Sequence, residues 1–336
     1  MDRNSMARVA NVMRPALPDG IEPLESPPNE SGPNELDIRI GATRRLINEA
    51  TSRLTKTPGV AMVEGPFDFN HPLLRHSIST DRGAVVSDRN KDGRGFNDGP
   101  LSSMVHATVV SQMISGFIKS RRELKMTGES ELILGAAPRL ARLTSVDVRS
   151  DATRRGYPST DDIVAGLDWV YQRKPLHGED KFNFEFAVVA LQKDVAGRMS
   201  HPSIKRYLNR LIRRGITPII PLGDKADSKN VMVDCPKAIY AGVKHHHRSL
   251  RYPKRTLLIP TNKWIACLPM SMDRDKPEFC EAFGSSIAAG IVAAALLLVR
   301  NLKNCDTEDA LAALVENTTR DGLLNVLNAI GRSAQP

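Results

Sequence analysis

The chain has 336 residues, of which 41% are hydrophobic and 25% are charged, so it can bury a sizeable core and is neither a fibrous nor a disordered protein. Its formal net charge is +9, but the basic residues are scattered, which favours a solvated basic surface and leaves nucleic acid as a lesser alternative partner. The cysteines lack Cys-x-x-Cys spacing, which predicts free thiols; they are Cys235, Cys267, Cys280 and Cys305.

The N-terminal part differs in composition from the rest of the chain. Residues 1–36 are rich in Pro, Gly, Ser and Glu, which predicts a disordered or loosely attached tail. Residues 37–57 form a helical lead-in, the main domain is expected at 58–331, and residues 332–336 are a short C-terminal tail. The N-terminus lacks the apolar core of a secretory signal, from which we expect an intracellular protein.

Strand and helix patterns alternate through the main domain. Apolar and β-branched runs predict strands at 60–64, 142–148, 184–191, 216–222, 238–244 and 256–260. Helical spacing predicts helices at 103–120, 159–173 and 203–215, another within 281–300, and one or two within 307–331. This alternation indicates an α/β domain with a mostly parallel sheet and helices on both faces, in which functional residues collect at the carboxyl ends of the strands.

The stretch "EAFGSSIAAGIVAAALLLVR" (281–300) contains thirteen consecutive uncharged apolar residues, Ile287–Val299. A membrane span needs about 20 such residues, so a buried core helix is the better interpretation and no membrane partner is expected. Ser286 lies at the start of this helix, where backbone N–H groups can stabilise a developing oxyanion. Ser286 is therefore a candidate nucleophile, and the competing interpretation is a simple helix N-cap.

A serine nucleophile needs a base, and the base needs an orienting carboxylate. His106 lies early in an apolar helix, in "MVHATVVSQMISG", and Glu64 ends the strand "VAMVE". The alternatives are a half-buried structural histidine and a solvated loop acid. The chain order of acid, histidine and serine is the order found in subtilisin.

At these positions the chain resembles the subtilases, the subtilisin-like serine peptidases, from about residue 58 to 331. "VAMVEGPFDFNHPLL" is similar to the family's Asp-Thr-Gly strand followed by Asp-Tyr-Asn-His-Pro, and "VHATVVSQMISG" is similar to its histidine helix. "GSSIAAGIVAAALLL" resembles the Gly-Thr-Ser-Met-Ala helix that carries the serine. The resemblance implies a three-layer α/β/α domain, a serine endopeptidase or its homologue, and a peptide or protein as substrate or ligand.

Carried over residue by residue, the resemblance places the nucleophile on Ser286 and the general base on His106. Glu64 takes the place of the orienting Asp, and Asp224 takes the place of the oxyanion-hole Asn. Residues Ala190, Leu191 and Gln192 stand where the family has the Ser-Leu-Gly of its substrate-binding strand. No cofactor is implied, and no metal site is assigned, because the calcium-like stretch 88–95 has Gly99 where an EF-hand has Glu.

These departures leave two functions open. A Ser-His-Glu triad is chemically workable, which favours an active intracellular endopeptidase. An ionised Asp224 accepts hydrogen bonds and repels negative charge, whereas the amide of Asn donates one to the oxyanion. The altered acid turn Gly65-Pro66, the oxyanion position and the substrate strand together favour a homologue with a degraded site, impaired or inactive, that serves as a binding or structural module.

Overall fold

The computed structural model describes residues 17, 21–24, 44–54, 56–78, 84–85, 101–118, 132–133, 135, 137, 139–148, 158–173, 183–191, 201–223, 235–244, 253–260, 263–269, 278–319 and 322–331. The central feature is a seven-stranded sheet in which every neighbouring pair of strands is parallel, in the order β10-β9-β8-β7-β2-β6-β3. Its strands are β2 (Gly59–Glu64), β3 (Ala84–Val85), β6 (Arg142–Asp147), β7 (Phe184–Val188), β8 (Thr217–Pro221), β9 (Ile239–Val243) and β10 (Thr256–Ile259). All six strands that the sequence predicts are present, and the short edge strand β3 is additional.

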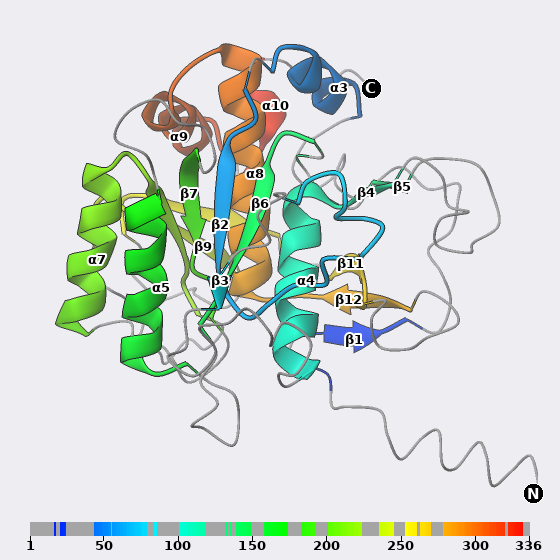
Figure 1. Ribbon diagram of the computed structural model, residues 1–336. Helices are drawn as coiled ribbons and strands as arrows, with labels where there is room; N and C mark the ends of the chain where they lie inside the picture. Colours follow the sequence, from blue (N-terminus) through cyan, green and yellow to red (C-terminus); the bar gives the residue numbers. More distant parts are fainter. Residues whose placement is uncertain are drawn as a thin grey trace, which may run out of the picture.

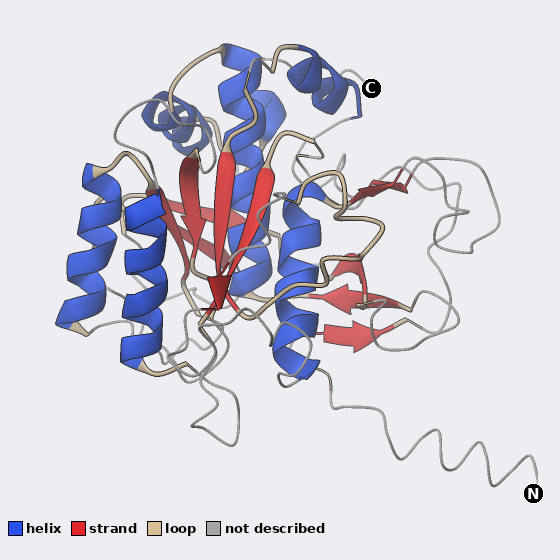
Figure 2. Ribbon diagram, viewed as in Figure 1, coloured by secondary structure: helices blue, strands red, loops and turns tan. Residues whose placement is uncertain are grey.

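Helices cover both faces of this sheet (Figures 1 and 2). One face is covered by α4 (Leu101–Ser115) and α8 (Ser285–Lys303), and the other by α5 (Thr160–Arg173) and α7 (Pro202–Arg213). Successive residues of a strand point to opposite faces, so β2 sends Val60 and Met62 into one core and Ala61 and Val63 into the other. The result is the three-layer α/β/α architecture that the sequence predicts.

Helix α8 is the buried helix expected within 281–300. Within the described residues, it alone is long and apolar enough to cross a membrane, and 83% of its most apolar window is buried inside the protein. It also packs against α3 (Arg44–Ser52), α9 (Thr307–Glu316) and the short α10 (Val326–Ala329). Helix α8 is therefore apolar because protein surrounds it.

The prediction of a loosely attached tail over residues 1–36 is wrong for one segment. Strand β1 (Ile21–Pro23) pairs antiparallel with β12 (Phe279–Ala282), which in turn pairs with β11 (Trp264–Cys267). Ile21 is buried in the larger core, and the Leu24 N–H donates to the Phe279 carbonyl at 2.9 Å. Long-range pairing thus orders a segment whose composition alone indicates disorder, because the proline ends the short strand rather than interrupting it.

The helix expected at 103–120 ends earlier, at Ser115. Phe117–Ile118 forms strand β4, which pairs with β5 (Leu132–Ile133). Gly116 lies between the helix and the strand. A Cβ added at Gly135 would lie 2.4 Å from the backbone nitrogen of Gly116. This close backbone approach redirects the chain out of the helix.

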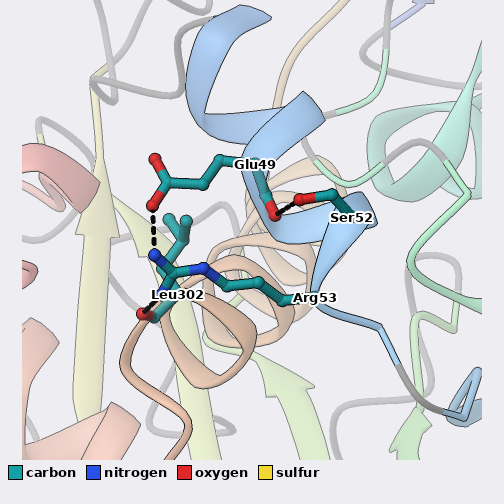
Figure 3. Close-up of polar contacts among 4 residues, drawn as sticks. All are labelled: Glu49, Ser52, Arg53 and Leu302. Carbon is teal, nitrogen blue, oxygen red and sulfur yellow. Dashed lines mark hydrogen bonds and ion pairs between the residues drawn. The ribbon is translucent and has the colours of Figure 1, made fainter.

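Helix α3, within the predicted lead-in, is fixed to the C-terminal end of α8 (Figure 3). The Arg53 guanidinium donates to the Leu302 carbonyl at 2.5 Å and to the Glu49 carboxylate at 2.6 Å. Because Leu302 lies in the last turn of α8, its carbonyl lacks a helical partner and its end of the helix dipole is negative. The Arg53 guanidinium supplies both a hydrogen-bond donor to this carbonyl and a positive charge at the negative end of the helix dipole.

Candidate active site

The sheet order places a topological switch point at β2. From β2 the chain builds β3 and β6 on one side of the sheet, and it then crosses to build β7, β8, β9 and β10 on the other. In open parallel sheets the crevice at the carboxyl ends beside such a point is the usual binding position. Glu64 is the last residue of β2 and lies at that edge.

Glu64 contacts His106 directly. Its Oε1 atom lies against Nδ1 of the imidazole, and the two residues are only 3% and 7% exposed. An ionised carboxylate only accepts hydrogen bonds, so this contact fixes the tautomer with the proton on Nδ1. The other ring nitrogen, Nε2, is then the one that can act as a base.

Burial acts against the ionised form of Glu64. Desolvation raises the pKa of the Glu64 carboxyl, His106 lowers it by charge and hydrogen bonding, and the neighbouring carboxylate of Asp147 raises it. Asp147 is the direct partner of Glu64 in the β2–β6 pairing. The second carboxylate oxygen, Oε2, is buried and accepts no hydrogen bond from the described residues. The charge on Glu64 therefore depends on His106.

Ser286 is the second residue of α8. The N-cap is Gly284, with φ of 114°, so the alternative interpretation of Ser286 as a simple N-cap is wrong. The next residue, Ser285, is buried, and its hydroxyl accepts a hydrogen bond from the Gly223 N–H at 3.1 Å. This bond ties the start of α8 to the end of β8, directly before Asp224, while Ser286 itself is half-buried.

Helices α4 and α8 meet closely at Gly290. A Cβ added there would lie 2.8 Å from the Val110 carbonyl oxygen and 3.1 Å from Met113 Cβ, so glycine permits this approach. His106 and Ser286 each lie four residues, about one helical turn, before the contact on their own helix. The structure thus brings Glu64 and His106 together and mounts Ser286 on the helix that packs against α4.

The remaining predicted site residues are only partly described. Ala190 and Leu191 follow β7 at the same edge of the sheet; Ala190 is buried and Leu191 is half-buried. Gln192 and Asp224 lie outside the described residues. Among the residues that are described, no group of three or more His, Cys, Asp or Glu side chains could hold a metal ion.

A buried polar clamp, formed by His71, Gln112 and the backbone of Cys267 and Leu268, was not predicted. The Gln112 side chain donates to the Cys267 carbonyl at 2.7 Å and accepts from the Cys267 N–H at 2.8 Å. His71 accepts from the Leu73 N–H through Nδ1 at 3.2 Å, which leaves Nε2 to donate to the Leu268 carbonyl at 3.3 Å. Both side chains are fully buried. The clamp fixes α4, and hence His106, against β11.

The one sequence signal for the clamp is Gln112 itself, a polar residue within the apolar stretch "MVHATVVSQMISG". A second contact supports α4 next to His106. The hydroxyl of Thr108, two residues after His106, accepts a hydrogen bond from the Asp68 N–H at 2.9 Å. The loop after β2 is therefore held to the helix that carries the candidate base.

Comparison with known proteins places this geometry in a fold class. No protein-family model matches the chain, and no curated protein matches it significantly. Among solved structures, the chain is similar to the prenylagaramide maturation protease PagA, with 17% identity and a TM-score of 0.59 over 85% of this chain and 98% of PagA. It is also similar to the PatG macrocyclase domain, solved alone and with a peptide, each with 14% identity and a TM-score of 0.61 over 90% of this chain and 98% of that domain.

PagA and the PatG macrocyclase domain are subtilisin-like proteases. The chain accordingly has the subtilisin-like fold, as its sequence motifs indicate.

Proposed function

We propose that this protein is a peptide-directed serine hydrolase of the subtilisin-like fold, with turnover reduced by its altered site. The contact between Glu64 and His106 is the observation that carries the proposal, because an orienting carboxylate on Nδ1 is what a histidine base requires. A peptide as ligand is supported by the similarity to the PatG macrocyclase domain, which is known in complex with a peptide.

The proposed reaction is acyl transfer through Ser286. Its Oγ attacks the peptide carbonyl carbon while His106 Nε2 takes the hydroxyl proton, and Glu64 stabilises the resulting imidazolium. When the tetrahedral intermediate collapses, the C–N bond breaks and His106 returns the proton to the departing amine. Water then hydrolyses the acyl-enzyme by the same route.

The oxyanion that forms in this step faces the start of α8. The first N–H groups of a helix have no partner within the helix, and the dipole there favours negative charge. Asp224, directly after the anchored Gly223, replaces the amide donor of the family with a carboxyl group. Loss of one such donor costs roughly 10²–10³ in turnover in a subtilisin, so a slow enzyme is expected.

The second candidate is a peptide-binding homologue without turnover. It is favoured by the Glu64 Oε2 atom, which is buried and lacks a donor among the described residues, and by the change at Asp224. A poorly stabilised carboxylate orients the imidazole less firmly, and a misplacement of about 1 Å is enough to reduce catalysis strongly.

Labelling with a fluorophosphonate probe separates these candidates. We expect slow labelling of the wild-type protein that is lost in Ser286→Ala and kept in Ser52→Ala, which removes an exposed hydroxyl on α3. Asp224→Asn combined with Glu64→Asp should accelerate the labelling. Labelling that persists in Ser286→Ala would overturn the assignment of the nucleophile. Complete silence of both the wild type and the double variant, with retained peptide binding, would establish the second candidate instead.

A further inference from the structure

The outer side of α7 carries an unbalanced positive charge. No acidic residue occurs from 201 to 223, whereas the helix and the residue after it contain five basic ones: Lys205, Arg206, Arg210, Arg213 and Arg214. Helix α7 covers the sheet face opposite to α4 and α8, as Figure 1 shows, so this surface is separate from the candidate active site. The proposed peptidase chemistry uses none of these residues.

Four of the arginines line one pocket together with Tyr171 of α5. The pocket has a volume of about 410 Å³, within the range of small-molecule sites. Arg210 lies four residues after Arg206 and four before Arg214, so these three side chains follow one side of the helix, and the adjacent Arg213 completes the pocket lining. The pocket is therefore built from guanidinium groups over an aromatic ring.

Aromatic rings hold two of these guanidinium groups in place. Arg210 lies 4.1 Å from the centroid of Tyr171 and 4.7 Å from that of Tyr207, and Arg214 lies 4.9 Å from the centroid of Tyr171. A guanidinium group stacked on a ring keeps its N–H edge for in-plane hydrogen bonds. Because the donors are positioned before a ligand arrives, less side-chain freedom is lost on binding.

Within the described part of the chain, the charges of the pocket are only partly neutralised. Arg210 forms an ion pair with Asp168 at 3.3 Å, so four guanidinium groups less one carboxylate leave three positive charges. The Arg214 Nε atom is buried and has no acceptor among the described residues. From the described residues, the pocket thus presents about three positive charges to a ligand, with the guanidinium groups of Arg210 and Arg214 held by aromatic rings.

We propose that Arg206, Arg210, Arg213, Arg214 and Tyr171 form a binding site for a polyphosphate group, carried by a nucleoside triphosphate or present as free polyphosphate. Linked phosphates place several charges within one pocket. In an extended peptide, carboxylates on the same side are two residues, or about 7 Å, apart. Three such carboxylates span more than the pocket, so an acidic peptide fits it less well than a polyphosphate. Arginine also matches phosphate geometry with paired N–H donors.

Calorimetric titration with inorganic triphosphate and with ATP tests this site at low salt. The test variant is Arg206→Gln/Arg213→Gln, which changes two exposed side chains. Arg45→Gln/Lys237→Gln removes the same charge from exposed positions elsewhere and is the matched control. We expect binding to the wild type and the control, and a loss of roughly tenfold or more in the test variant. Arg206→Lys/Arg213→Lys should bind at an intermediate level, because it keeps the charge but not the paired donors.

The ligand arms identify the source of the phosphates. Equal affinity for both ligands indicates recognition of the phosphate chain alone, and tighter binding of ATP indicates an added contact to the nucleoside; both support the site. Absence of binding to either ligand overturns the proposal. So does equal weakening in the control variant, or preferential binding of a hexaglutamate peptide or a single-stranded oligonucleotide. Because Ser286 plays no part, labelling by fluorophosphonate is expected to be unchanged in the test variant.

Discussion

The two helical layers of this molecule use polar residues in opposite ways. In the layer of α4 and α8, buried polar side chains make specific pairs: Glu64 with His106, and Gln112 with the Cys267 backbone. In the layer of α5 and α7 they lie on the outside, where arginines stack on tyrosines. Both layers pack an apolar core on the same sheet. The difference arises because further helices cover α8, whereas among the described elements α7 packs mainly on α5 and β8, so that one layer is suited to chemistry and the other to surface recognition.

The largest expected effect comes from replacing one glutamine in each layer by leucine. Gln112→Leu removes both buried hydrogen bonds that the Gln112 side chain makes to the Cys267 backbone, so we expect the free energy of unfolding to fall by about 3–5 kcal/mol. Gln172→Leu, on the exposed side of α5, should change it by less than about 0.5 kcal/mol. Chemical denaturation measures both values. Similar losses in the two variants would contradict the contrast.

A second test uses the buried His71 of the clamp. Burial lowers the pKa of His71 to about 4, from 6.5 in an exposed histidine. Between these values the unfolded chain binds the proton and the folded one does not, so stability falls as pH drops from 6.5 towards 4. The shift corresponds to about 3 kcal/mol, measured as unfolding free energy against pH.

The control for this test is His71→Asn, which offers a neutral acceptor to the Leu73 N–H and does not titrate. Between pH 6.5 and 4, the unfolding free energy of this variant should fall by about 3 kcal/mol less than that of the wild type. If the variant and the wild type show the same slope, His71 does not cause the acid sensitivity.

The smallest test compares the close helix contact in each layer. A Cβ at Gly290 meets the Val110 carbonyl at 2.8 Å, whereas a Cβ at Gly166 of α5 meets the Val148 side chain at 2.3 Å. Gly290→Ala and Gly166→Ala should each lower the unfolding free energy by about 1–3 kcal/mol. In double-mutant cycles, Val148→Ala should rescue Gly166→Ala in part, and Met113→Ala should leave Gly290→Ala unrescued, because a backbone atom sets that limit. If Met113→Ala rescued Gly290→Ala as much as Val148→Ala rescues Gly166→Ala, the backbone contact at Gly290 would not be what limits it.

Local patterns predicted the elements that bury regular apolar faces. The strand over 184–191, the amphipathic helix over 203–215 and the core helix within 281–300 were all found, because packing and periodicity agree there. Strand β1 was missed, since Ile21–Pro23 is ordered by β12, more than 250 residues further along the chain. A two- or four-residue strand such as β3 or β11 has too few residues to show a period.

The candidate site was predictable to a similar degree. The order of Glu64 and His106 along the chain indicated their contact. The conformation of Gly284, which makes it the N-cap in place of Ser286, has no local signature beyond glycine itself. The pairing of Gln112 with Cys267 joins residues 155 positions apart and depends on the tertiary fold. The arginines of α7 were visible in the sequence, but their stacking on Tyr171 of another helix was not.

The attachments of the N-terminal segment have a consequence for the order in which the chain can assemble during synthesis. Strand β1 needs β12, and Arg53 needs the carbonyl of Leu302. Both partners are synthesised more than 240 residues later, so β1 and Arg53 can make these contacts only after β12 and the end of α8 have been translated. Contacts between such distant residues slow folding, because a long loop must close before they form. Strand β1 and helix α3 are therefore expected to reach their native positions late in folding, after the elements that hold them.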